Sequence, residues 1–146
     1  MIIRFFENNE LTAIAKLSKA FANENCCNGI VADNVDYFRD KKVAVVIDNG
    51  EIIGYGYGTF DLSKKNKSYI RKNEKLFYIE EMYVVKNKRN LGVGIKLFQF
   101  LEDYAKTNGA NIIELNAVSK DYNKLLNFYI KKLNMNFLSA YLYKKI

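Results

Sequence analysis

The residues best suited to chemistry in this chain lie within one stretch, residues 79–95. Two adjacent carboxylates, Glu80 and Glu81, come first, and a basic turn with the pattern R-x-x-G-x-G follows over Arg89–Gly94. Helical spacing of apolar residues from Ile95 to Lys106 predicts that this turn opens a helix. A glycine-bearing turn at a helix start leaves backbone N–H groups without partners and adds the positive end of the helix dipole. We therefore predict an anion site that suits a pyrophosphate.

Two other phosphate motifs do not fit this turn. The dinucleotide fingerprint needs a third glycine and an acidic residue about 20 residues further on. Here Leu97 stands at the third glycine position, and the next strand brings only Glu114. A P-loop needs Gly-Lys-Ser/Thr, whereas Gly94 is followed by Ile95-Lys96-Leu97. Both classes are excluded.

The composition fits one α/β domain over residues 1–146, with 49% hydrophobic residues and hence a real core. The absence of histidine excludes His-based catalysis and His-ligated zinc, and the adjacent Cys26 and Cys27 make no spaced metal motif, so we expect no metal. No apolar run is long enough to span a membrane, and the N-terminus does not resemble a secretory signal. We therefore expect a cytoplasmic protein without a membrane partner.

The net charge of +7 admits two interpretations. Clustered lysines attract polyanions such as nucleic acid. Alternatively, the charge reflects a compositional bias toward Asn, Lys and Ile, together with a phosphorylated cofactor. We favour the second interpretation, because no nucleic-acid recognition motif accompanies the charge.

The remaining patterns predict how the chain positions these residues. Asn49-Gly50 predicts a type I′ hairpin turn, and Asn34 predicts a helix cap. The glycines of the strand after the hairpin leave one of its faces bare for a neighbouring backbone or a ligand. The lysine-rich segment 61–75 is predicted to be a loop. We expect strands over 2–6, 43–47, 52–60, 76–85, 110–116 and 136–143, and helices over 11–21, 34–39, 95–106 and 121–132. This order predicts an α/β domain with a mixed sheet.

Four features of nearly the whole chain resemble the GNAT superfamily of acyl-CoA-dependent N-acyltransferases. They are the Asn49-Gly50 hairpin with its glycine-spaced strand, Ile79–Val84 leading into Arg89–Gly94, the strand after the long helix, and Asn127-Phe128-Tyr129 on the next helix. The pattern is nearest to polyamine and aminoglycoside N-acetyltransferases. The resemblance implies a central, mostly antiparallel sheet with a splayed parallel strand pair, flanked by about four helices.

The resemblance also implies which residues contact acetyl-CoA. The backbone of the turn would bind its pyrophosphate, and the splayed strand its pantetheine arm. The family often has an asparagine seven residues before the tyrosine; Tyr122 stands there, with Asn123 beside it. The implied set is Met82, Tyr83, Val84, Arg89, Asn90, Leu91, Gly92, Val93, Gly94, Ile95 and Asn123.

Two catalytic roles follow from the resemblance. A protonated amine must lose a proton before it can attack a thioester, and the family pattern favours Glu80 as the base. Because neighbouring strand residues point to opposite faces, we expect Glu80 on the Met82 face and Glu81 turned away. Tyr129 matches the proton donor for the departing thiolate. The alternatives are that the glutamates are surface ion-pair partners and that Tyr129 is a core aromatic residue.

The sequence thus predicts an N-acetyltransferase that moves the acetyl group of acetyl-CoA to a primary amine by direct attack in a ternary complex. The acceptor is a small-molecule or peptide amine, and exposed β structure near the C-terminus favours a homodimer. A non-catalytic acyl-CoA-binding module is the first alternative. A basic nucleic-acid-binding protein is the second.

Overall fold

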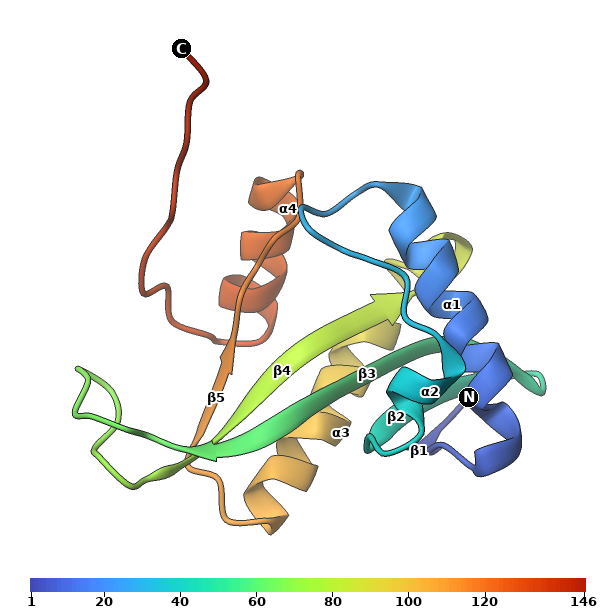
Figure 1. The fold of residues 1–146 in the computed structure, drawn as a ribbon, viewed down its shortest axis with the longest axis horizontal. Helices are drawn as coiled ribbons and strands as arrows, with labels where there is room; N and C mark the ends of the chain where they lie inside the picture. The colour runs from blue at the N-terminus through green and yellow to red at the C-terminus, as the bar shows by residue number, and fades with distance from the viewer.

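A five-stranded mixed sheet organises the fold in a computed structural model that describes residues 1–146 (Figure 1). Its neighbours pair antiparallel except for the last two strands, which pair parallel. The strands lie in sequence order across the sheet: β1 (Ile2–Phe5), β2 (Val43–Asp48), β3 (Glu51–Leu62), β4 (Lys75–Val84) and β5 (Ile112–Leu115). The predicted mixed, mostly antiparallel sheet is confirmed.

Helices cover both faces of this sheet. The helical segments are η1 (Asn8–Glu10), α1 (Leu11–Glu24), α2 (Val35–Phe38), η2 (Lys86–Lys88), α3 (Val93–Thr107), α4 (Tyr122–Leu126) and a π turn that continues α4, η3 (Asn127–Lys132). Helices α1 and α2 pack on the face that carries Tyr55 and Tyr57. Helix α3 packs on the opposite face, where Leu97 and Leu101 are fully buried against Phe77.

Local sequence signals account for several boundaries. Asn49 and Gly50 adopt φ angles of 50° and 81°, as the predicted type I′ hairpin requires. The Asn34 side chain accepts a hydrogen bond of 3.0 Å from the N–H of Tyr37 and so caps α2. The bare face of β3 receives α3, because a Cβ on Gly56 would lie 3.2 Å from Leu101 Cδ1.

The parallel pair separates part of the way along β4. Pairing runs from Leu76–Ile112 to Ile79–Leu115, while β4 continues to Val84 against β3 alone. Beyond β5 the chain leaves β4, and Ser119 pairs antiparallel with Cys27, which follows α1. The stretch in which β4 has no strand partner on its β5 side, between the last parallel pair and this bridge, is called the gap below.

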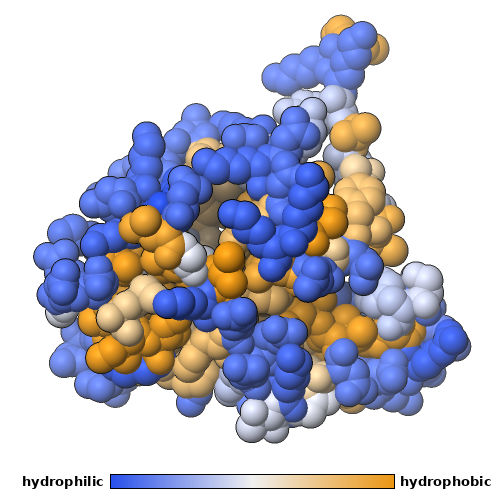
Figure 2. All heavy atoms as spheres, turned by 180° about the vertical axis from the view of Figure 1, so that it is seen from behind, coloured by the Kyte–Doolittle hydropathy of each residue, from blue (hydrophilic) through white to orange (hydrophobic).

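The prediction of strands over 136–143 is wrong. This segment forms no strand, although its residues have the composition of one. It projects from the body of the molecule with hydrophobic residues along it (Figure 2), and Tyr141 is 99% exposed. A strand needs a pairing partner for its backbone groups, and no backbone hydrogen bond joins this segment to a strand.

Candidate acyl-transfer site

The turn before α3 presents a row of free backbone N–H groups. The Arg89 amide donates to Lys86 over 3.4 Å, and the Lys96 amide donates to Gly92 over 3.1 Å. Between them, the amides of residues 90–95 donate to no backbone or side-chain acceptor within the protein. They precede a helix of 15 residues, whose dipole adds positive potential at the same point. The row can therefore bind an anion rich in oxygen acceptors.

Left-handed backbone conformations shape this row. Asn90 (φ 62°) and Gly92 (φ 77°) both lie in that region, which asparagine tolerates better than most residues with a side chain. A Cβ on Gly92 would have no atom within 4 Å, which leaves open space beside its amide. A Cβ on Gly94 would lie 3.3 Å from the Phe128 ring, so this glycine admits the helix that carries Tyr129.

The Arg89 side chain faces inward and fixes the turn to the rest of the site. Its Nη2 donates to Glu24 Oε1 over 2.9 Å, and its Nε donates to the Val84 carbonyl over 2.7 Å. The Tyr83 hydroxyl donates to the same Glu24 oxygen over 2.6 Å. Burial alone would raise the pKa of Glu24, but these two donors outweigh it and lower that pKa. The guanidinium is therefore already committed to a carboxylate rather than free for a phosphate.

The far end of β4 has backbone groups that face the gap. The Val85 amide donates to Ile53 of β3 over 2.9 Å. Because backbone groups alternate in direction along an antiparallel strand, those of Met82 and Val84 point away from β3, to the side that β5 has left. The Val84 carbonyl is taken by Arg89, while the Met82 N–H and C=O face the gap. An amide-containing ligand would extend the sheet there.

The expected opposite orientation of Glu80 and Glu81 is wrong. The register of β3 and β4 shifts between Tyr57–Glu81 and Gly58–Ile79, so both glutamates oppose one residue in a β-bulge. Glu80 reaches Tyr37 and Lys41 on the α2 side, and Glu81 reaches Tyr55 on the same side. Met82 packs on the α3 side instead. The bulge therefore brings both carboxylates to one face.

The two carboxylates differ in their surroundings. Glu81 accepts a hydrogen bond from the buried Tyr55 hydroxyl. Burial raises the pKa of Glu81, and the nearby charges of Asp33 and Glu80 add to that effect, while Tyr55 opposes it. The Glu80 side chain is 25% exposed and lies 3.5 Å from the Lys41 ammonium. Glu80 is thus the carboxylate that a solvent-borne amine can reach.

Tyr129 lies in η3, close to Cys27 of the bridge that follows β5. Its ring packs edge-on against Phe98 of α3 and against Phe128, with centroid distances of 6.5 Å and 5.1 Å. Its hydroxyl has no hydrogen-bond partner within the protein and is not sealed from solvent. Burial raises the pKa of Tyr129 to about 12, and the nearby Cys27 thiol adds to the shift.

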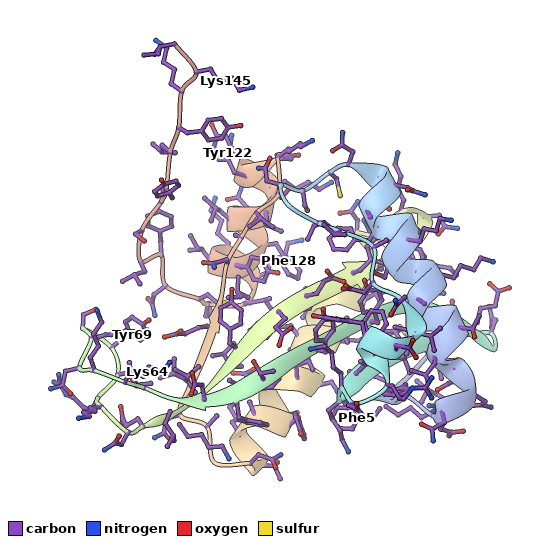
Figure 3. The ribbon with its side chains drawn as sticks, viewed as in Figure 1. Phe5, Lys64, Tyr69, Tyr122, Phe128 and Lys145 are labelled. Atoms are coloured by element: carbon purple, nitrogen blue, oxygen red, sulfur yellow. The ribbon has the colours of Figure 1, made fainter.

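Two further sequence predictions concern Asn123, at the start of α4, and the lysine-rich segment 61–75. Asn123 and Tyr122 are exposed in the first turn of α4, and Figure 3 shows Tyr122 at the outer end of that helix and Phe128 on its sheet-facing side. Figure 3 also places Lys64 and Tyr69 on the loop after β3, at the end of the sheet opposite α1 and α2. The lysine-rich loop is therefore far from Glu80.

Sequence reasoning missed several residues of the site. Three of these residues meet β4 only through the fold: Glu24, Tyr37 and Lys41. Each is 39 or more positions away from its partner in β4. Nothing in their local sequence marks them, because α1 and α2 carry no motif. Only Asn34, the cap of α2, indicates that Tyr37 lies on a short helix.

A mixed sheet with a splayed parallel pair, free amides at the next helix and a tyrosine at the gap defines an acyl-CoA N-acyltransferase-like class. The family model described as "Acetyltransferase (GNAT) family" matches residues 10–135. The chain therefore belongs to the GNAT acetyltransferase family. No curated protein sequence matches it.

Solved structures share the fold over almost the whole chain. A tetramutant of the BH1408 protein from Bacillus halodurans has a TM-score of 0.71 and 21% identity, with 100% of both chains covered. The aminoglycoside acetyltransferase meta-AAC0020, from an uncultured soil metagenomic sample and solved with sisomicin, has a TM-score of 0.71 and 17% identity over 99% of this chain and 95% of that one. The aminoglycoside N-acetyltransferase AAC(6')-Iy, solved with CoA, has a TM-score of 0.71 and 14% identity over 99% and 98%.

None of the helices is both long and apolar enough to cross a bilayer. No group of three or more Cys, Asp or Glu side chains is placed to hold a metal ion.

Proposed function

We propose that this protein transfers the acetyl group of acetyl-CoA to a primary amine, by direct attack within a ternary complex. The observation that carries the proposal is the row of free amides at residues 90–95 beside the unpaired end of β4. The open space at Gly92 fits a bulky anion such as the pyrophosphate of CoA. The Met82 backbone fits the peptide-like pantetheine arm, which supplies the thioester carbon to be attacked. Among the residues expected to contact CoA, Arg89 acts by holding the turn in place through its side chain. Support is weakest for Asn123, which is exposed in the first turn of α4.

Glu80 is the proposed base. It lies at the bulge, two residues before the free Met82 backbone, and its carboxylate is partly open to solvent. An alkylammonium has a pKa of about 10.4, so a neighbouring carboxylate must take its proton, directly or through water, before attack. The Met82 N–H is the proposed donor that polarises the thioester carbonyl.

Tyr129 is the proposed proton donor. With a pKa of about 12 its phenol stays protonated at neutral pH, as a donor must. The same shift makes it a weaker acid than a free tyrosine. Transfer of the Tyr129 proton to the thiolate is therefore uphill. It is completed when the resulting tyrosinate takes a proton from water.

Two measurements test this function. Calorimetric titration with CoA should give one binding site per chain, which a nucleic-acid-binding protein would lack. Release of free thiol from acetyl-CoA with a panel of primary amines then separates an enzyme from a binding module. CoA binding without thiol release for any amine would reduce the proposal to a binding module.

A matched pair of variants tests the base. Glu80→Gln should lower kcat/KM by about 10²-fold, and the loss should shrink at high pH as free amine accumulates. Glu81→Gln is the control because it removes the neighbouring charge on the same face of the sheet. Equal losses in both variants would contradict the assignment of Glu80.

We also propose a homodimer formed through the C-terminal segment. Its hydrophobic side chains are exposed: Phe137, Leu138, Tyr141, Leu142 and Tyr143. A cleft of ≈ 690 Å³ runs along the outer edge of β5, and residues 133–138 line part of it. That edge has no strand partner, so the segment of a second copy would satisfy it by β-pairing.

A further inference from the structure

The acceptor side of the site already contains an ammonium group, that of Lys41. Its Nζ lies 3.5 Å from Glu80 Oε2, 4.4 Å from the centroid of the Tyr37 ring and 5.2 Å from that of Tyr57. The two rings meet at 71° with centroids 6.2 Å apart and so form two walls. A cation between two tyrosine faces and beside a carboxylate is held by cation–π attraction and by an ion pair.

This position is unusual for a lysine, which normally extends its ammonium into water. The Lys41 side chain is 24% exposed, and Tyr57 beneath it is 3% exposed. The adjacent Lys42 offers a comparison within the same chain. Its Nζ lies 4.7 Å from the centroid of Phe5, which packs with the core on the α3 side and away from the glutamates.

The polar contacts of this pocket connect it to the proposed base. The Tyr57 hydroxyl donates to the Tyr37 hydroxyl over 3.3 Å, and the Tyr37 hydroxyl donates to Glu80 over 3.4 Å. Lys41 and Tyr37 thus share one oxygen of Glu80. An amine that gives its proton directly to this oxygen from between the two rings must take the place of the Lys41 ammonium.

Building on the proposed function, we propose that Lys41 occupies the acceptor-amine position and that the acceptor binds by displacing it. The pocket formed by Tyr37, Tyr57 and Glu80 then selects the acceptor. Its resident group is a primary ammonium on an unbranched four-carbon stem. The acceptor class that fits best is therefore a primary ammonium on an unbranched alkyl arm, as in a lysine side chain or a simple alkylamine.

Titration with n-butylamine hydrochloride, without any acetyl-CoA, tests the proposal. Ring signals of Tyr37 and Tyr57 are followed by NMR in wild type, Lys41→Met and the control Lys42→Met. We expect Lys41→Met to bind n-butylammonium about tenfold more tightly than wild type, because a weak internal competitor is gone. Lys42→Met removes the same charge one residue away and should match wild type. Branched tert-butylamine should bind each protein more weakly.

A second measurement needs no variant. As n-butylamine saturates the two tyrosine rings of the wild type, the ε-methylene signal of Lys41 should move toward that of a solvent-exposed lysine. Saturation of the rings with an unmoved Lys41 signal, or equal affinities in all three proteins, would overturn the proposal. The titration contains no acetyl-CoA, so its outcome does not depend on whether the protein is an active acetyltransferase. Failed displacement would overturn this proposal and leave the proposed function standing.

Discussion

Removing the Tyr55 hydroxyl should destabilise the protein in a way that depends on pH. Tyr55 is fully buried, and its hydroxyl donates to Glu81. A hydrogen bond to a charged group contributes about 1.5–3 kcal/mol, and a neutral one about 0.5–1.5 kcal/mol. Tyr55→Phe should therefore lower the free energy of unfolding by about 2 kcal/mol where Glu81 is ionised, and by less where it is protonated.

The sign follows from the pKa of Glu81. Burial raises that pKa in the folded state, and the Tyr55 hydroxyl opposes the rise. Without the hydroxyl the folded pKa rises further above its unfolded value of about 4.3. A carboxyl with a raised folded pKa loses stability as the pH rises through that pKa. The penalty of Tyr55→Phe should thus be smallest near about pH 4.5 and grow toward about pH 7.5.

Urea denaturation of wild type and variant across that pH range measures the effect. Tyr57→Phe is the matched control, because Tyr57 is equally buried in the same strand but donates to the neutral Tyr37 hydroxyl over 3.3 Å. Its penalty should be at most about 1.5 kcal/mol and nearly independent of pH. A Tyr55→Phe penalty of the same size at both ends of the range would refute the charged hydrogen bond.

Two further predictions concern the cofactor turn and the oligomeric state. Gly92→Glu should abolish CoA binding in calorimetry, because it adds a like charge and fills the space beside the turn. Gly50→Glu is the control and should keep CoA binding, because it puts the same side chain at another left-handed glycine with open surroundings. Both substitutions should destabilise the fold by about 1–2 kcal/mol, so retained CoA affinity in the first would contradict the site. Light scattering should give twice the chain mass of 16.9 kDa, and Tyr141→Asp with Leu142→Asp should give a monomer; a monomeric wild type would exclude the dimer.

The features that sequence predicted well are those set by neighbours in the chain. The type I′ turn at Asn49-Gly50 depends on two φ angles that few residues tolerate, and the cap of α2 depends on one side chain three residues from its partner. The glycine turn belongs to the same class, because the free amides of residues 90–95 follow from a helix start and left-handed residues alone. Its position was therefore predictable to within two residues, with α3 beginning at Val93 rather than Ile95.

The features that sequence missed depend on the strand partner. Strict alternation puts Glu80 and Glu81 on opposite faces, and only the register against β3 shows that the strand has an extra residue there. Lys41 likewise would be expected at the surface because it is a lysine. Its place between Tyr37 and Tyr57 depends on how α2 packs on the sheet. The C-terminal segment has strand composition, yet whether it pairs depends on a partner edge rather than on its own residues.

The bulge at Glu80 comes immediately after the last parallel pair, Ile79–Leu115. On one side of β4, the end of that pairing frees the Met82 backbone for a ligand. On the α2 face, the extra residue adds a second carboxylate within reach of Tyr37 and Lys41. A regular strand would offer the same free backbone but would turn one glutamate to the α3 side, where the core is apolar. A single inserted residue thus puts the carboxylate of Glu80, the proposed base, on the α2 face of β4, two residues before the free backbone of Met82.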